Sequence, residues 1–195
     1  MTEKEKLSAG LLCDPYRCEE IVKERNFCKT LCQRHNQLPY EDFEGRKAIL
    51  RQLIGKIDGD FNIEPPFICN FGYNILLGKN FYANHNLVIL DLAKVEIGDN
   101  VLIAPNCGIY TAGHPLDAED RNAGLEYAFP VKIGNNVWIG GHVCIMPGVT
   151  IGDNAVIAGG SVVVKDIPSG TLAGGNPCRV IRKITAEDKN KYRRL

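Results

Sequence analysis

The chain has 195 residues, 45% of them hydrophobic and 24% charged, and its 23 basic side chains balance its 23 acidic ones. Such a chain can bury the core of about one domain, which excludes a protein that is disordered throughout. Zero net charge gives no long-range attraction to nucleic acid or to an anionic membrane. The charged start MTEKEKLSAGLL lacks the apolar core of a signal peptide, and no apolar run reaches the ~20 residues of a membrane span, so we expect a cytoplasmic protein.

The first part of the chain has the apolar spacing of two helices, the second of them over residues 41–54. Asp14 and Pro15 suit an N-cap followed by the first helical position of the first helix. His35 falls near the end of this helix, where a cation would complement the helix dipole. Neither helix carries enough apolar residues to fold alone. We therefore expect residues 1–58 to form a helical segment that caps the rest of the chain.

Eight cysteines are distributed along the sequence without a secretion signal, so a disulfide framework is not expected. A zinc site would need closely spaced pairs of ligands. Cys28 and Cys32 come closest, but their spacing equally suits one face of a helix. We expect buried free thiols and no metal site.

Short segments with a shared pattern recur from residue 76 onward. An aliphatic residue, glycine, a polar residue and asparagine follow one another in LLGKNF (76–81), EIGDNV (96–101), KIGNNV (132–137) and TIGDNA (150–155). Aliphatic residues also return at every sixth position. This period fits neither an amphipathic helix nor a hairpin, but it is typical of a parallel β-helix with three strand-and-turn units per coil. We expect a mainly β domain over residues 59–185 and a tail over 186–195.

One long insertion, Tyr110 to Pro130, interrupts the repeat and carries His114 near its start. A lone histidine more often packs in a loop than catalyses a reaction. Its place at the root of a loop on a rigid scaffold nevertheless favours a functional role.

Several motifs extend beyond the repeat: NFYANHN, YTAGHPLDAEDRNAG, VKIGNNVWIGG and GGNPCRVIRKI. Together they resemble the maltose and galactoside acetyltransferases of the hexapeptide-repeat acyltransferase superfamily, over nearly the whole chain. The resemblance implies a left-handed parallel β-helix that works as a homotrimer. It also implies transfer of an acetyl group from acetyl-CoA to a sugar hydroxyl, commonly the 6-hydroxyl of a hexose unit, as in glucose, maltose or a galactoside.

The resemblance makes His114 the general base. A sugar hydroxyl must lose its proton as it attacks the thioester, and histidine suits this task because its ordinary pKa of ~6.5 is near working pH. His85 is a weaker candidate near the acceptor, and His142 falls in a repeat turn. A γ-type carbonic anhydrase, built on the same β-helix, would need three histidines spaced to bind zinc. This spacing is absent, so the reaction is expected to need no metal.

The resemblance also implies a set of coenzyme A contacts. Gly140-Gly141 would offer a backbone N–H to the oxyanion of the tetrahedral intermediate, although it would also suit an ordinary corner of the coil. The pantetheine arm would run along the coils and the phosphates would meet cations, unless these cations are only solvated surface charges. The expected contacts are Gly141, Gly159, Val164, Lys165, Arg179 and Arg182.

The resemblance also implies that the sugar acceptor is bound by Asp14, Asn70 and Asn84, whose polar groups can bind hydroxyls. Galactoside-type members have two consecutive acidic residues after the NLxIxD strand, whereas this chain has Asp91 followed by Leu92. The second acceptor carboxylate is therefore missing, which favours glucose or maltose over a β-galactoside. Two alternatives stay open: an antibiotic or nucleotide amino sugar as acceptor, and a non-catalytic β-helix that serves as an assembly module.

Overall fold

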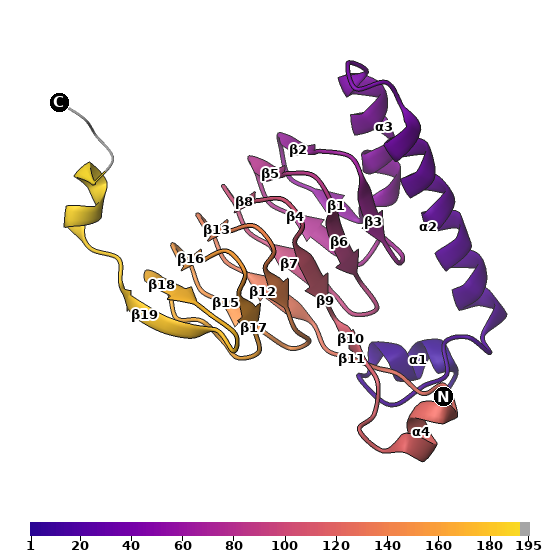
Figure 1. Cartoon of the computed structure of the whole chain (residues 1–195). Coiled ribbons are helices and arrows are strands. Elements are labelled where there is room, and N and C mark those ends of the chain that lie inside the picture. The colour runs from indigo at the N-terminus through magenta and orange to yellow at the C-terminus, as the bar shows by residue number, and fades with distance from the viewer. Residues whose placement is uncertain (192–195) are drawn as a thin grey trace.

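Short parallel strands, stacked in three sheets, make the body of the molecule (Figure 1). The computed structural model describes residues 1–191. The first face of the prism contains β1 (Lys56–Ile57), β4 (Ile75–Leu77), β7 (Val95–Ile97), β12 (Val131–Ile133) and β15 (Thr150–Ile151). The second contains β2 (Phe61–Ile63), β5 (Phe81–Ala83), β8 (Leu102–Ile103), β13 (Trp138–Ile139), β16 (Val156–Ile157) and β18 (Thr171–Gly174). The third contains β3 (Phe67–Cys69), β6 (Leu87–Leu90), β9 (Gly108–Tyr110), β14 (Cys144–Ile145) and β17 (Val162–Val163).

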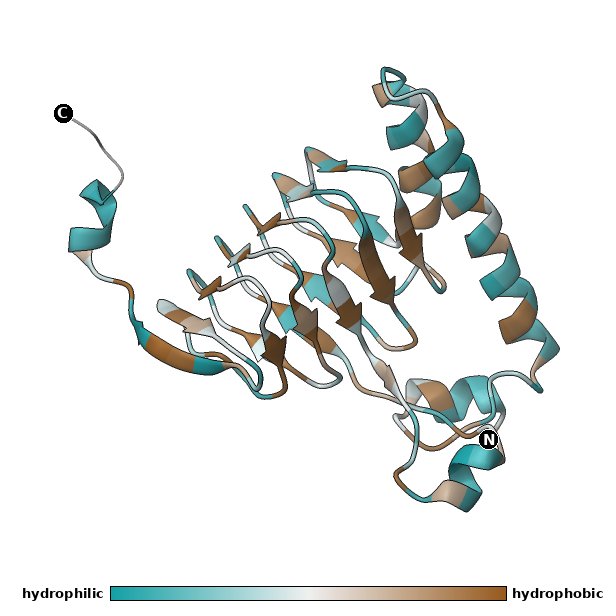
Figure 2. Ribbon diagram, viewed as in Figure 1, coloured by the Kyte–Doolittle hydropathy of each residue, from teal (hydrophilic) through white to brown (hydrophobic). Residues whose placement is uncertain are grey.

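The chain visits the faces in the order first, second, third and then returns to the first, so the expected parallel β-helix is confirmed. The recurring aliphatic residues point into a common interior; Ile97, Ile103 and Ile109 belong to one coil and are all buried. Figure 2 shows hydrophobic residues concentrated in the strands and hydrophilic residues over the helices. We name the edges of the prism by the faces they join: the 1–2, 2–3 and 3–1 edges.

The recurring asparagines turn the corner at the 1–2 edge. Asn80, Asn100, Asn136 and Asn154 all have φ of 57° or 58°, a left-handed conformation that asparagine tolerates better than most residues. Their amides form a ladder across the coils, with N···O distances of 2.9 to 3.0 Å. The ladder holds successive coils in one register.

Three helices precede the coil: α1 (Glu3–Ser8), α2 (Glu19–Gln37) and α3 (Phe43–Leu53). The α2 helix packs on β3 and covers the open end of the coil with Cys28, Leu31 and Cys32. Asp42 caps α3 by accepting a hydrogen bond from the Gly45 N–H. The second predicted helix is therefore confirmed, one or two residues shorter at each end.

Two expectations for the first helix are wrong. The helix begins at Glu19, and Asp14 instead accepts hydrogen bonds from the backbone N–H groups of Tyr16 and Arg17 in the preceding turn. His35 is fully buried, and desolvation lowers its pKa. A neutral imidazole cannot complement the helix dipole as a cation would.

The other end of the coil is closed by β19 (Arg179–Lys183), which runs antiparallel to β18. A 3₁₀ helix at Ala186–Asn190 follows, and residues 192–195 of the expected tail are outside the described range. The helical cap and this C-terminal segment lie at opposite ends of the prism (Figure 1). No helix within residues 1–191 is long and apolar enough to cross a bilayer.

Candidate active site

The long insertion leaves the third face after β9, rejoins the first face at β12, and so projects from the 3–1 edge (Figure 1). It contains β10 (Ala112–Gly113), paired antiparallel with β11 (Tyr127–Ala128), and the short helix α4 (Ala118–Asn122). A Cβ atom at Gly113 would lie 2.4 Å from the Tyr127 hydroxyl, so the ring packs closely over the glycine. This contact fixes the backbone immediately before His114.

His114 is held by one hydrogen bond and faces one carboxylate. Its Nδ1 lies 3.1 Å from the carbonyl oxygen of Leu125. Because a carbonyl can only accept, Nδ1 carries the proton in this arrangement and Nε2 is left with a lone pair. Nε2 lies 4.0 Å from Oε1 of Glu126, and the His114 side chain is 52% exposed whereas that of Glu126 is 7% exposed. The imidazole can therefore accept a proton from an incoming group beside a buried negative charge.

Glu126 was missed in the sequence analysis, although it stands in the apolar run LEYAF, where a charged residue is unexpected. Its backbone forms a two-bond bridge with Cys13, at N···O distances of 3.1 and 2.9 Å. The bridge brings the N-terminal segment against the loop. As a result, the Asp14 carboxylate lies 3.8 Å from the position that a Cβ atom would take on Gly124.

Asn70 lies on the same edge as this loop, two coils nearer the helical cap. Its backbone N–H and those of Phe71 and Gly72 all donate to the Asp91 carboxylate, at 2.9, 2.9 and 2.6 Å. Asp91 is fully buried, and desolvation raises its pKa to about 6. Leu92 beside it is also buried, in an apolar cluster between the N-terminal segment and the loop. Asp91 thus organises the turn that carries Asn70.

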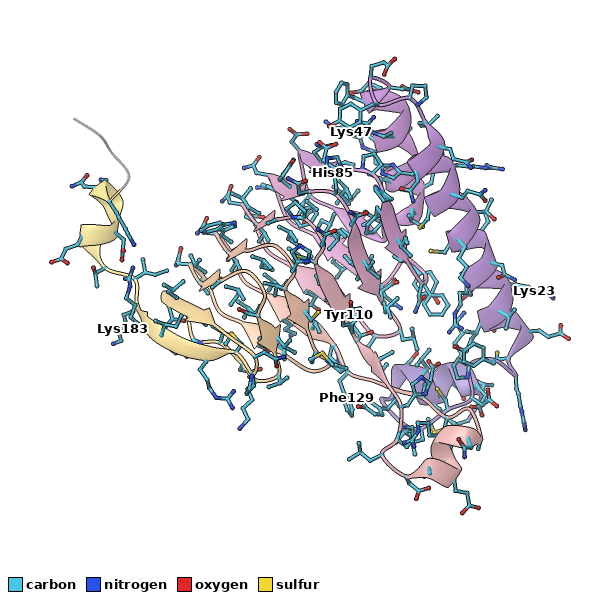
Figure 3. The ribbon with its side chains drawn as sticks, in the orientation of Figure 1. Lys23, Lys47, His85, Tyr110, Phe129 and Lys183 are labelled. Atoms are coloured by element: carbon cyan, nitrogen blue, oxygen red, sulfur yellow. The ribbon has the colours of Figure 1, made fainter. Side chains whose placement is uncertain are left out.

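Asn84 lies on a different edge, together with the turns that contain Gly140-Gly141 and Gly159-Gly160. Asn84 follows β5, and its side-chain oxygen accepts a hydrogen bond from the His85 N–H at 2.7 Å. Gly141 and Gly159 follow β13 and β16 on the same 2–3 edge. In Figure 3, His85 and Phe129, which lies near the end of the loop, are labelled on opposite sides of the coil. One chain therefore does not bring Asn84, Gly141 and Gly159 to His114.

The glycine turns permit close approach of neighbouring coils. A Cβ atom on Gly140 would lie 2.5 Å from the backbone nitrogen of Gly159. A Cβ on Gly160, by contrast, would meet nothing within 4 Å. The Cβ side of Gly160 is thus open, whereas the neighbouring backbone leaves no room for a side chain at Gly140.

The expected pantetheine contact Val164 and the expected phosphate contacts, which are Lys165, Arg179 and Arg182, are spread over two segments. Val164 and Lys165 are exposed and follow β17 on the 3–1 edge. Arg179 and Arg182 lie on β19, where Arg182 forms a two-bond ion pair with Asp188 at 2.7 and 2.6 Å. A phosphate would therefore compete with Asp188 for Arg182.

Two family models match separate parts of the chain. The maltose acetyltransferase hexapeptide capping motif matches residues 6–59, which contain the three N-terminal helices except for the first residues of α1. The bacterial transferase hexapeptide model, with six repeats, matches residues 130–165 in the coil.

Several relatives match almost the whole chain. The galactoside O-acetyltransferase of Escherichia coli is 47% identical over 192 residues, which cover 98% of this chain and 94% of that protein. The crystal structure of a maltose O-acetyltransferase from Clostridium difficile is 55% identical with a TM-score of 0.92, covering 95% of this chain and 98% of the other. A galactoside acetyltransferase in complex with coenzyme A is 46% identical with a TM-score of 0.96, covering 100% and 96%. The chain therefore belongs to the maltose and galactoside O-acetyltransferase family of hexapeptide-repeat transferases.

Proposed function

We propose that this protein transfers the acetyl group of acetyl-CoA to a hydroxyl group of a sugar, with His114 as the general base. The observation that carries the proposal is the set of contacts at the ring: Nδ1 donates to Leu125 and Nε2 stands 4.0 Å from Glu126. The sugar and coenzyme A chemistry is supported by the relatives that are named for maltose and galactoside and by the coenzyme A complex.

In this mechanism Nε2 removes the proton of the sugar hydroxyl while its oxygen attacks the thioester carbonyl. The imidazolium that forms is stabilised by the Glu126 carboxylate and by the Leu125 carbonyl. The backbone N–H at Gly141 is the proposed donor to the oxyanion. When the carbon–sulfur bond breaks, the proton passes from Nε2 to the departing thiolate, which restores the neutral ring.

The acceptor is proposed to be a sugar built of hexose units, with glucose or maltose favoured. Asp14 and Asn70 lie on the side of the molecule that carries the loop and would bind hydroxyls there. Leu92 stands where galactoside-type members carry a second acidic residue, and it is buried among apolar side chains. An apolar side chain offers no acceptor to a hydroxyl, which supports the preference against a β-galactoside.

We further infer that the site is completed between copies of the chain, in a homotrimer. His114 projects from the 3–1 edge, whereas Asn84, Gly141 and Gly159 lie on the 2–3 edge. The second face carries outward apolar side chains such as Leu102 and Trp138, about half exposed, and the third face carries Ile68. The first face is charged, with ion pairs from Glu96 to its neighbouring lysines. Two unlike apolar faces suit a closed ring in which each copy contacts two neighbours.

A cytoplasmic location is part of the same proposal. All eight cysteines are free thiols, and six of them are buried. Free thiols persist in a reducing compartment, whereas secreted proteins commonly oxidise theirs.

The experiment that tests the proposal is release of free coenzyme A from acetyl-CoA against a panel of acceptors: glucose, maltose, a β-galactoside, a nucleotide amino sugar and a streptogramin. Turnover with glucose or maltose should fall by about 10²–10⁴ in His114→Ala while coenzyme A binding, measured by calorimetry, is retained. Leu116→Ala is the matched control, because Leu116 is in the same loop and 98% exposed. Full activity of His114→Ala would refute the general-base role, and turnover only with the streptogramin or amino sugar would refute the sugar acceptor.

A further inference from the structure

Three cysteines meet under the helical cap, away from the proposed active site. Cys28 and Cys32 come from adjacent turns of α2, and Cys69 ends β3. The sulfur atom of Cys69 lies 3.5 Å from that of Cys28 and 3.7 Å from that of Cys32, and all three atoms lie within 4.8 Å of one another. Each residue is at most 4% exposed.

We propose that these three thiols form a binding site for a single soft, thiophilic metal ion. Metal–sulfur bonds of about 2.3 Å place three sulfurs about 4.0 Å apart in a trigonal site and about 3.8 Å apart in a tetrahedral one. The observed separations differ from these values by a few tenths of an ångström for two of the three pairs. An ion can therefore be bound without movement of the backbone. Sulfur ligands select soft cations over hard ones such as Mg²⁺.

The backbone around the cluster is fixed before any metal arrives. Asn36, one turn beyond Cys32, donates to the Phe67 carbonyl at 2.9 Å and accepts from the Phe67 N–H at 2.8 Å. These two bonds hold α2 at a set distance from β3. The Cys28 thiol also lies 3.3 Å from the Cys69 carbonyl oxygen. Such preorganisation lowers the cost of assembling ligands that come from distant parts of the chain.

An entry path leads to the thiols. A surface depression of about 460 Å³ is lined by Cys32 and Cys69 together with Lys29, Gln33 and Asn36. When a divalent ion binds, three S–H protons leave to solvent and three metal–sulfur bonds form, so the centre has a net charge of minus one. The ammonium group of Lys29 at the mouth would offset part of this charge.

The proposed ion would join the cap to the first coil and would take no part in acetyl transfer. The sequence alone predicts no metal site, because Cys28 and Cys32 are close in sequence whereas Cys69 is 37 residues beyond Cys32. Only the packing of α2 across the end of the coil brings the third sulfur to the other two.

The test is titration of the reduced full-length protein with Cd²⁺ in a buffer without thiols, followed by the ultraviolet charge-transfer band of cadmium thiolates. One ion per chain is expected, with three sulfur neighbours counted by X-ray absorption at the cadmium edge and no displacement by Mg²⁺. No saturable binding, or fewer than three sulfurs, would overturn the proposal without recourse to any variant.

Variants then locate the ion. Cys69→Ser should weaken Cd²⁺ binding by more than about tenfold, whereas Cys178→Ser, at the opposite end of the coil, should leave it unchanged. Cys32→Ser, on the side of the surface depression, takes the place of Cys69→Ser if that variant fails to show a cooperative thermal transition. Unchanged Cd²⁺ affinity in the folded variant would assign the ion to other thiols and refute the site.

Discussion

Replacement of Glu126 by glutamine would remove the buried charge beside His114 and keep the shape of the side chain. The bridge between Glu126 and Cys13 uses backbone atoms only, so it should survive this substitution. The variant therefore separates the electrostatic role of the carboxylate from its place in the loop.

The expected magnitude follows from the 4.0 Å between Nε2 and Oε1. Two unit charges at this separation interact by about 1 kcal/mol in water and by about 4 kcal/mol at an effective dielectric constant of 20. His114 is half exposed, so the lower part of this range applies, and we expect a loss of about 1–2 kcal/mol of transition-state stabilisation. That loss corresponds to a decrease in kcat of about 5- to 30-fold.

The assay is coenzyme A release at saturating acetyl-CoA and acceptor, with KM for acetyl-CoA measured in parallel and expected to stay constant. Glu119→Gln is the control, because Glu119 is an exposed acidic residue of α4 in the same loop. An unchanged kcat in Glu126→Gln would refute the electrostatic reasoning. A loss as large as that of His114→Ala would show instead that Glu126 holds the loop together.

Three further predictions concern stability and assembly. Burial raises the pKa of Asp91 to about 6, above its ordinary 3.8, so its contribution to stability is full only below pH ~3.8 and is lost as pH rises through 6. The free energy of unfolding of the wild type should therefore fall relative to that of Asp91→Asn by about 2.5 kcal/mol from pH 4 to 7, as denaturant titrations would measure. Asn136→Ala should lower the free energy of unfolding by about 2–3 kcal/mol, because alanine is strained at a φ of 57° and two hydrogen bonds of the asparagine ladder are lost. Asn136→Gly should lower it by less in the same measurement, because glycine adopts this φ without strain. Trp138→Glu puts a charge on the apolar second face and should dissociate the proposed trimer in sedimentation experiments, whereas a retained trimer would exclude this face from the interface.

The coil could be predicted from sequence because the residue pattern of each repeat depends only on the structure of that repeat and its neighbours. An inward aliphatic residue and a left-handed asparagine, as in Ile133 and Asn136, depend only on local geometry and on the adjacent coils. The predictions of a left-handed coil and of a trimer, in contrast, rest on the family resemblance and not on the six-residue period of the sequence.

The surroundings of His114 could not be predicted in the same way, because they depend on contacts between distant segments. Glu126 reaches its position through a bridge to Cys13, 113 residues away, and no periodic pattern records such a pairing. For a related reason the prediction of a helix cap at Asp14 is wrong. The local sequence suits a cap, but the adjacent Cys13 is bonded to the loop and the helix starts five residues after Asp14.

The two ends of the insertion lie together at the 3–1 edge, which affects how enzymes of this family can diverge in sequence. The Phe129 N–H donates to the Thr111 carbonyl at 2.8 Å, so the loop leaves and returns at one point of the edge while β9 and β14 stay paired. We therefore expect that replacement of the loop would leave the coil intact. The backbone bridge between Glu126 of the loop and Cys13, however, means that the loop and the N-terminal segment depend on each other for their positions. A chimera that takes its loop from one relative and its first 20 or so residues from another should fold but align its histidine poorly, so the two segments are expected to be inherited together.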